Sequence, residues 1–301
     1  MPSTKSVNPI TPASPSALKA YFLASRPKTW IAGVSPVFIG AAMGEGIEIG
    51  TFILTLLFSL CIQIGANYAN DYFDFIKGAD SHLRNGPKRA TQEGWIAPSS
   101  MWLATFAAFG CALLVGIPLM IIAGLWSLLI AAGCIAFGVL YTGGPKPLGY
   151  LGLGEGLVAV FFGPVAVCGS YFLQTGSVNS AVLIASLAPG LLSCSILIAN
   201  NLRDEKSDRA ADKRTLIVRF GRTFGAWEYT LSIWLSGAIP FVLVFGCGKP
   251  LLLLSASLVL LVSLPSIQKV FSFRDPLELI SVLQNSALVL FLYTALFCVF
   301  V

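Results

Sequence analysis

Charged residues are scarce in this chain, and so are the groups that most catalytic and metal sites use. Asp, Glu, Lys and Arg together account for 11% of its 301 residues, against about 25% in a typical soluble domain. It has one histidine, His82, and its seven cysteines stand singly, without a CxxC pair. These absences exclude a Ser-His-Asp set and argue against a zinc site or a disulfide framework. No basic soluble module stands apart from the hydrophobic segments, so a nucleic-acid partner is not expected.

Long hydrophobic runs take up most of the chain. Hydrophobic residues make up 56% of the sequence, and the mean hydropathy is +0.81. A run of about 20 apolar residues spans a bilayer as a helix, and these runs lack the alternation of barrel strands. The sequence therefore predicts an all-α integral membrane protein with nine transmembrane helices, near residues 28–44, 51–72, 99–119, 121–141, 151–173, 179–200, 224–246, 250–268 and 279–300.

The polar segments outside these runs predict the domain organisation and the orientation. Residues 1–19 are polar and have no hydrophobic segment ahead of a cleavage site, so we expect a disordered cytosolic tail and one transmembrane domain over residues 20–301. With the N-terminus in the cytosol, 18 of the 19 Lys and Arg residues face the cytosol and only Lys249 faces out. Because positive loops stay inside, the sequence predicts a multi-pass protein of the inner (cytoplasmic) membrane with its polar loops in the cytosol.

A first polar cluster follows the second predicted span. Asn67, Asn70, Asp71 and Asp74 are spaced i, i+3, i+4 and i+7, which is one face of a helix. Ionisable residues at the mouth of a membrane helix usually face a bundle interior or a polar cavity. Oxygen ligands without nitrogen or sulfur favour Mg²⁺ or Ca²⁺ over zinc. The alternative is that these residues only mark where the helix leaves the membrane.

A second polar cluster follows the sixth predicted span. Asp204, Asp208 and Asp212 step by four, so on a continuing helix they form a second acidic stripe. Six of the seven aspartates thus fall in two places four spans apart, which suggests an internal duplication. Cations lie within or near the two clusters: Arg84, Lys88, Arg89, Lys146, Arg203, Lys206, Arg209, Lys213 and Arg214. Carboxylates that hold a metal, together with cations, suit a diphosphate, although Lys206 and Arg209 are expected on a solvated face and Lys146, like Arg26 and Lys28, could equally be a positive-inside anchor.

These motifs resemble those of the UbiA superfamily of intramembrane aromatic prenyltransferases. The NDxxD and DxxxD patterns of that family correspond to Asn70, Asp71 and Asp74, and to Asp204 and Asp208. The sequence is most similar to the branch that prenylates 1,4-dihydroxy-2-naphthoate in menaquinone synthesis. In this branch the last acid of the first motif lies at the position of Asp80, after Gly78. The resemblance covers nearly the whole chain, from the Arg-Pro-Lys-Thr string at residues 26–29 to Thr215.

The resemblance implies a fold, a reaction and a set of site residues. It implies nine helices around a central cavity, and transfer of a polyprenyl chain from an all-trans polyprenyl diphosphate to the naphthoate, with decarboxylation to demethylmenaquinol. Catalytic residues would be Asp71, Asp74, Asp204 and Asp208. The Mg²⁺ ligands would be Asp74, Asp80, Asp204 and Asp208. The diphosphate would be bound by Asn70, Arg84, Arg89, Lys146 and Lys213, and the aromatic wall of the pocket would include Tyr68, Tyr72 and Tyr141, although aromatic residues at span ends more often form an interfacial belt.

Two kinds of alternative remain at this level. A sibling enzyme would use the same donor site with another acceptor, such as 1,4-dihydroxy-6-naphthoate or 4-hydroxybenzoate, and the motifs do not separate these acceptors, nor do they give the chain length, a general base or the oligomeric state. A transporter is the alternative from another class. Transporters usually carry their coupling residues near mid-membrane on broken helices, whereas the acids of this chain gather at one membrane surface.

Overall fold

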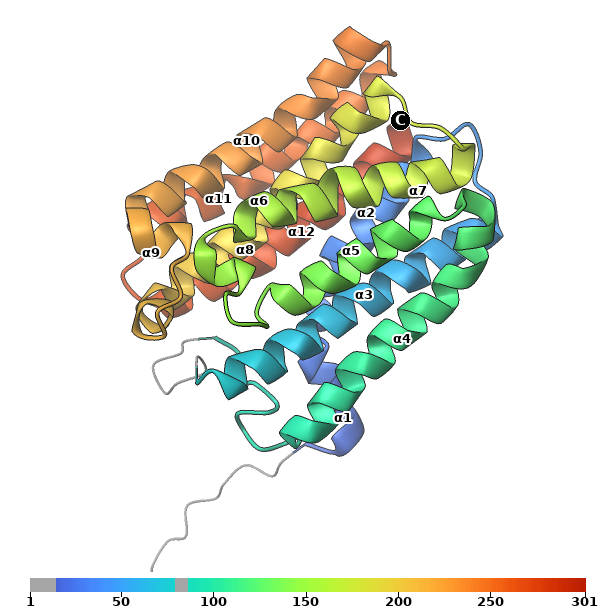
Figure 1. Ribbon diagram of the computed structural model, residues 1–301. Helices are drawn as coiled ribbons and strands as arrows, with labels where there is room; N and C mark the ends of the chain where they lie inside the picture. Colours follow the sequence, from blue (N-terminus) through green and yellow to red (C-terminus); the bar gives the residue numbers. More distant parts are fainter. Residues whose placement is uncertain (1–14, 79–85) are drawn as a thin grey trace, which may run out of the picture.

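The computed structural model describes residues 15–78 and 86–301, so Asp80, His82 and Arg84 lie outside the described residues. Every regular element in the described part is helical (Figure 1). The α-helices are α1 (Ala17–Ala24), α2 (Trp30–Ala42), α3 (Ile49–Ile76), α4 (Pro98–Ala123), α5 (Trp126–Leu140), α6 (Gly154–Val160), α7 (Ala166–Thr175), α8 (Ser180–Ala210), α9 (Leu216–Phe220), α10 (Arg222–Cys247), α11 (Val259–Ser272) and α12 (Leu279–Phe300). Short helical segments are η1 (Pro27–Thr29), η2 (Leu148–Leu151), η3 (Phe161–Val165), η4 (Leu251–Leu258) and η5 (Pro276–Glu278).

The all-helical membrane architecture is confirmed, but the count of nine spans is not. Within the described residues, seven helical stretches are long and apolar enough to cross a bilayer. The two other predicted spans, near 28–44 and 121–141, correspond to α2 and α5, which have only 13 and 15 residues. A bilayer-spanning helix needs about 20 residues. The apolar runs overestimated these helices because α2 begins only after the turn at Pro27, and α5 begins after Gly124, whose φ of +77° ends the preceding helix.

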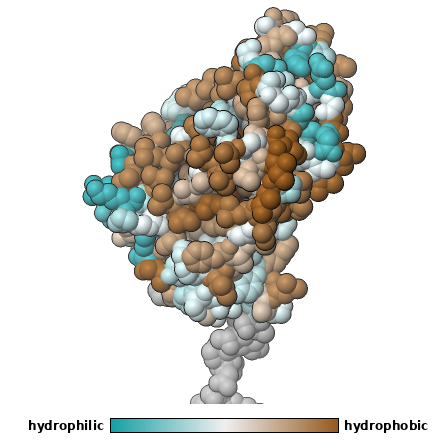
Figure 2. Space-filling view, turned by 45° about the vertical axis from the view of Figure 1, so that its right-hand side comes forward, coloured by the Kyte–Doolittle hydropathy of each residue, from teal (hydrophilic) through white to brown (hydrophobic). Residues whose placement is uncertain are grey.

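The surface has the inverted polarity of a membrane protein. Large hydrophobic side chains are exposed over most of the bundle; Phe245 is 73% exposed and Leu103 is 70% exposed. Hydrophobic residues cover the middle of the face seen in Figure 2, and hydrophilic residues gather toward its two ends. Such a surface is suited to lipid contact on its sides and to water at its ends.

Helix α8 runs through the core and fixes the position of α6. Gly190 of α8 lies so close to α6 that a Cβ atom there would come within 2.5 Å of the Ala159 carbonyl oxygen. Small residues allow this close approach of membrane helices. At the polar end of the same contact, the Asn201 amide donates a 2.8 Å hydrogen bond to the buried Glu155 carboxylate. These contacts hold the end of α8 beside the start of α6.

The loops that follow α3, α5 and α8 lie at the same end of the bundle, at the lower left of Figure 1. Lys77, after α3, donates hydrogen bonds to the carbonyl oxygens of Thr142 and Gly144, after α5. The backbone N–H of Arg214, after α8, donates to the carbonyl oxygen of Tyr150. The fold thus brings both aspartate motifs to one end of the bundle.

Candidate active site

The polar face of α3 is covered by η1 and by the loop at residues 86–97. Asn67 donates hydrogen bonds of 2.8 Å to the Ser25 carbonyl oxygen and 3.1 Å to the Thr29 hydroxyl. One turn further on, Asn70 accepts hydrogen bonds from both Arg26 and Arg89. The residues that the sequence places on one face of this helix therefore form one continuous polar surface on α3.

Asp71 holds the 86–97 loop in place. The sequence predicts a catalytic role for this residue, but both of its carboxylate oxygens accept backbone N–H groups, from Ala90 at 3.2 Å and from Thr91 at 3.0 Å. The residue is 1% exposed. A carboxylate bonded in this way is directed at the loop, and its effect is to position the preceding residue, Arg89.

Arg89 and Asp74 form a buried ion pair at the end of α3. The guanidinium lies 3.1 Å from Asp74 Oδ2 and also donates to Asn70 Oδ1 at 2.7 Å. Both side chains of the pair are less than a tenth exposed, at 9% and 8%. Both hydrogen bonds come from the same Nη2 atom, which holds the guanidinium between two oxygen acceptors, so Arg89 is a preorganised positive group beside the Asp74 carboxylate.

The second motif contributes two of its three aspartates to the interior. Asp204 is paired with Arg203 at 2.6 Å, and Asp208 Oδ1 lies 3.2 Å from Lys213 Nζ. The other oxygen, Asp208 Oδ2, is buried and has no hydrogen-bond partner among the described residues. A buried carboxylate oxygen that accepts no hydrogen bond destabilises the folded state. Asp208 Oδ2 is therefore available to bind an incoming ligand.

Asp212 does not continue the acidic stripe. Helix α8 ends at Ala210, and Asp212 has a left-handed backbone with a φ of +51°. Its side chain is 82% exposed and pairs with Arg214. The stripe expected on a continuing helix is therefore shorter by one carboxylate, because the helix stops before the third aspartate.

Tyr150 connects the two motifs. Its hydroxyl donates to Asp74 Oδ1 at 3.4 Å, and its ring lies under Lys77 and Lys213, with centroid distances of 5.2 Å and 5.9 Å. Burial alone would lower the pKa of Lys213, but nearby carboxylates outweigh that effect and raise the pKa above its ordinary value. The carboxylates that do so come from both motifs and are Asp208, Asp74 and Asp204. The two acid groups therefore share one site, with Lys213 between them.

The sequence reasoning missed Tyr150, and its contacts predict the effect of two substitutions. Tyr150→Phe removes a long hydrogen bond but keeps the ring under the two lysines, so most of the turnover should remain. Tyr150→Leu also removes the cation–π contacts, each about 0.5–2 kcal/mol, and should reduce turnover by about tenfold, which corresponds to about 1.4 kcal/mol. Initial rates of the purified variants at saturating substrate measure both effects. Equal rates in the two variants would contradict the role given to the ring.

The donor atoms of the site fit Mg²⁺. Asp74, Asp204 and Asp208 supply only oxygen, and Asp208 Oδ2 has no hydrogen-bond partner among the described residues. The parts of the chain at 15–78 and 86–301 contain no preformed group of three acidic, histidine or cysteine side chains around one metal position. Mg²⁺ typically uses one or two carboxylates and completes its octahedron with water and substrate phosphate, so a preformed cage is not required.

The remaining predicted residues lie at differing distances from this centre. Lys146 is exposed and makes no ion pair with a described residue. Tyr68 and Tyr72 pack on the outer side of α3, Tyr68 donating to the Tyr21 carbonyl oxygen and Tyr72 stacking on Trp102 at 4.9 Å. Tyr141 instead lies beside the start of α6, where a Cβ atom on Gly154 would come 3.0 Å from its hydroxyl.

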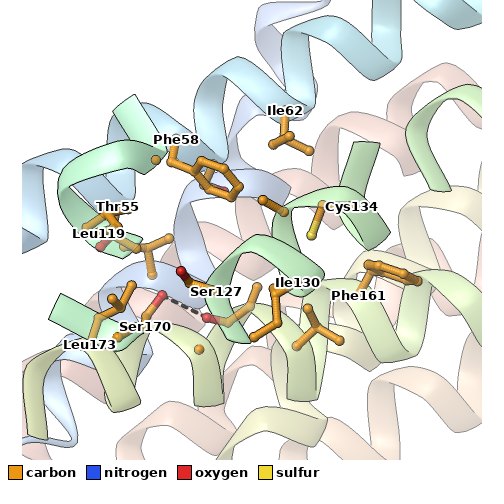
Figure 3. Close-up of a pocket in the computed structure, with 18 of the residues that line it drawn as sticks. Thr55, Phe58, Ile62, Leu119, Ser127, Ile130, Cys134, Phe161, Ser170 and Leu173 are labelled. Atoms are coloured by element: carbon orange, nitrogen blue, oxygen red, sulfur yellow. Dashed lines mark hydrogen bonds between the residues drawn. The ribbon is translucent and has the colours of Figure 1, made fainter. Parts of the chain in front are cut away.

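A large apolar cavity lies further along α3 and α5, away from the acid groups. It has a volume of about 550 Å³ and lies between α2, α3, α4, α5 and the η3–α7 segment (Figure 3). Phe137 and Phe161 line it, and their rings stack with a centroid distance of 4.4 Å, while Phe137 also contacts Tyr141 at 5.6 Å. This pair could not be predicted from the sequence, because both residues lie within uniformly apolar runs.

Comparison with known proteins agrees with this architecture. The profile described as "UbiA prenyltransferase family" matches residues 33–295. A protein of Mycobacterium tuberculosis named 1,4-dihydroxy-2-naphthoate octaprenyltransferase is 37% identical over 273 residues, 89% of this chain and 92% of its own length. A protein of the same name from Haemophilus influenzae is 35% identical and covers 93% of this chain and 94% of its own length.

Solved structures of the family share the fold. The UbiA homolog from Aeropyrum pernix superposes with a TM-score of 0.69 at 16% identity, over 91% of this chain and 98% of that one. The UbiA homolog from Archaeoglobus fulgidus bound to GPP and Mg²⁺ gives 0.64 at 18% identity, over 92% and 99%. By the profile match over residues 33–295 and the relatives at 35–37% identity, the chain belongs to the UbiA prenyltransferase family.

Proposed function

We propose that this protein transfers a polyprenyl group from its diphosphate to 1,4-dihydroxy-2-naphthoate, with loss of the carboxylate, to give demethylmenaquinol. The names of the relatives from M. tuberculosis and H. influenzae support the acceptor, at 37% and 35% identity over most of the chain. One observation carries the reaction type. Asp74, Asp208 and Lys213 meet around Tyr150 at the polar end of a helix bundle that also holds an apolar cavity, which is an arrangement for a charged head group with a hydrophobic tail.

The charged residues bind the diphosphate and the metal in this proposal. Arg89 and Lys213 take negative charge of the diphosphate, and Lys146 and Arg84 are proposed to assist from their loops. Asp74, Asp204 and Asp208 hold Mg²⁺, with Asp80 as a further proposed ligand. Mg²⁺ held by these residues would supply positive charge to offset the charge that develops on the leaving group. From the positive-inside distribution of Lys and Arg, we place this site on the cytosolic side of the inner membrane.

The chemical step is the cleavage of an allylic C–O bond. Its electron pair leaves with the diphosphate, and Arg89 and Lys213 are already in place where that charge appears, which lowers the barrier. The ring carbon that carries the carboxylate then forms a C–C bond to the allylic cation. Carbon dioxide leaves from that carbon, and its electron pair restores the aromatic ring. Because loss of CO₂ replaces loss of a ring proton, this scheme needs no strong base.

The apolar and aromatic residues protect the allylic cation. Aromatic faces attract cations, and Tyr141, Phe137 and Phe161 lead from the acid groups into the cavity. A tyrosine phenol keeps its proton near neutral pH, so Tyr141 presents no anionic oxygen that would capture the cation.

The product of the purified protein tests this proposal. Protein in detergent, with a polyprenyl diphosphate and Mg²⁺, is offered 1,4-dihydroxy-2-naphthoate, 1,4-dihydroxy-6-naphthoate and 4-hydroxybenzoate in separate reactions. We expect the mass of the prenylated, decarboxylated product with the first acceptor, no product after chelation of divalent ions, and recovery when Mg²⁺ is added back. Product only with another acceptor would reassign the enzyme to a sibling activity. Substrate flux into sealed vesicles without chemical change would instead support a transporter.

A further inference from the structure

Helix α6 covers one face of α8 as far as Glu155. A Cβ atom on Gly190 of α8 would come within 2.5 Å of the Ala159 carbonyl oxygen. One turn after Gly190, the Cys194 thiol donates a hydrogen bond of 3.0 Å to the Glu155 carbonyl oxygen. Because α6 begins at Gly154, its contact with this face of α8 ends at the first turn of α6.

The same face of α8 continues into the acid site. Cys194, Asn201 and Asp208 follow one another at steps of seven, and seven residues are close to two helical turns, so the three share a face. The Asn201 amide donates its 2.8 Å hydrogen bond to Glu155 Oε1. With a rise of 1.5 Å per residue, Asn201 lies about 4.5 Å from Asp204 along the axis, toward the apolar part of α8. Glu155 and Asn201 therefore form the floor of the acid site.

Glu155 differs from the other acids of the site because it has no cation beside it. The residue is 6% exposed, and it forms no ion pair with a described residue. Asp74, Asp204 and Asp208 each have an arginine or lysine partner. A carboxylate at the start of a membrane helix is costly to bury and usually belongs to a functional site. Glu155 is therefore a candidate for a role other than binding the metal or the diphosphate.

The depth of Glu155 matches the depth at which the two substrates react. In the proposed function, the diphosphate is held at the level of Asp204 and Asp208, and the allylic carbon is bonded directly to a diphosphate oxygen. The acceptor carbon has to come within about 3–3.5 Å of that allylic carbon. On the other side of Glu155, six residues further along the chain, Phe161 lines the apolar cavity. The Glu155 carboxylate thus lies between the charged end and the cavity, beside the place of the acceptor ring.

We propose that Glu155 is a catalytic residue that binds the ring hydroxyl next to the alkylated carbon and holds its proton during the reaction. This inference rests on the proposed function for the presence of the acceptor. When the ring carbon bonds to the allylic cation, the O–H bond of the neighbouring hydroxyl breaks, its electron pair forms a C=O bond, and the proton passes to Glu155. The bond to the carboxylate then breaks, CO₂ leaves, and the electron pair of that bond restores the ring. The ketone oxygen becomes a hydroxyl again by taking the proton back from Glu155.

Two variants of Glu155 separate this role from a structural one. Glu155→Gln keeps the side-chain length and an oxygen for the Asn201 amide, but it does not accept a proton. It should lower kcat with 1,4-dihydroxy-2-naphthoate by about 100-fold, within the range of general acid–base catalysis. The Kd for a polyprenyl diphosphate with Mg²⁺ and no acceptor, measured by calorimetric titration, should stay unchanged. Glu155→Asp keeps a carboxylate on a shorter side chain and should be faster than Glu155→Gln, whereas a residue that only bonded to Asn201 would give the opposite order.

Glu228→Gln is the matched control. Glu228 is also an acid on a membrane helix packed against α8, and its Oε2 atom is buried without a hydrogen-bond partner in the described part of the chain. It lies one turn after Gly225, which packs on Leu202, so α10 meets a different face of α8. This variant should keep wild-type turnover. Wild-type turnover in Glu155→Gln, or equal losses in Glu155→Gln and Glu228→Gln, would overturn the inference. Wild-type protein that gives no product with this acceptor would instead overturn the proposed function.

Discussion

Asp208→Asn is expected to reduce prenyl transfer by about 100-fold or more, the loss typical when one group that stabilises developing charge is removed. The asparagine has nearly the same shape but carries no charge, so its amide oxygen is a weaker ligand for Mg²⁺ than a carboxylate. In the native protein, Asp208 Oδ1 lies 3.2 Å from Lys213, and Oδ2 is buried without a hydrogen-bond partner in the described part of the chain. An oxygen kept in that state is available for a ligand that arrives with the substrate. Turnover with a defined prenyl diphosphate and Mg²⁺ measures the effect.

The stability of the same variant separates a functional role from a structural one. Asp208 is buried near Asp204 and Asp74, so removing its charge removes a desolvation cost and a repulsion that together outweigh the lost attraction to Lys213. The midpoint of thermal unfolding in detergent should therefore stay the same or rise while activity falls. If Asp208 only held the fold together, the midpoint would fall with the activity.

Asp212→Asn is the matched control for Asp208→Asn. Asp212 belongs to the same run of aspartates at steps of four, but its side chain is 82% exposed and paired with Arg214. Exposed ion pairs contribute about 0–1 kcal/mol, and asparagine tolerates the left-handed backbone at this position. Turnover should stay close to that of the wild type. Equal turnover in Asp208→Asn and Asp212→Asn would remove Asp208 from the site.

The position of the site could be predicted from the sequence, because helix periodicity decides it. Residues at steps of three and four share a helix face. The apolar run that precedes each polar cluster indicates that the cluster lies at the C-terminal end of a membrane helix. Asn70, Asp74, Asp204 and Asp208 were found in this way. The all-helical membrane fold follows from the same runs, although run length alone did not reveal that α2 and α5 are short.

Contacts between distant segments could not be predicted. The exclusion of Asp212 depends on where α8 ends, and no breaker such as Gly or Pro stands between Asp208 and Asp212 to indicate it. Asp71 is on the predicted face, yet only the path of the 86–97 loop directs its carboxylate to backbone N–H groups. The roles of Tyr150 and of the Phe137–Phe161 pair depend on packing between segments that are distant in the sequence. The sequence does not indicate which residue an aromatic side chain will contact.

Arg89→Ala is expected to lower the free energy of unfolding by about 3–5 kcal/mol, the cost of removing one partner of a buried ion pair, and to abolish transfer. The guanidinium lies 3.1 Å from Asp74 and 2.7 Å from Asn70 Oδ1, and both partners of the ion pair are buried. Without it, the Asp74 carboxylate loses the cation nearest to its Oδ2 atom among the described ion pairs, and the diphosphate loses a cation. Arg89→Lys should recover stability only in part, because an ammonium is more strongly hydrated than a guanidinium and therefore costs more to bury. Chemical unfolding in detergent and turnover measure the two effects.

The double variant Arg89→Ala/Asp74→Ala distinguishes the electrostatic cause from general damage to the loop. Removing the second charge takes away the uncompensated carboxylate, so the double variant should be more stable than Arg89→Ala alone, as expected for coupled residues, yet remain inactive. Lys88→Ala is the control, because Lys88 is the neighbouring cation, is 61% exposed and pairs only with Glu93 among the described residues. It should behave like the wild type in both measurements. A double variant no more stable than Arg89→Ala would show that loss of the ion pair is not what destabilises the protein, and the loop held by Asp71 would then be the element that Arg89 supports.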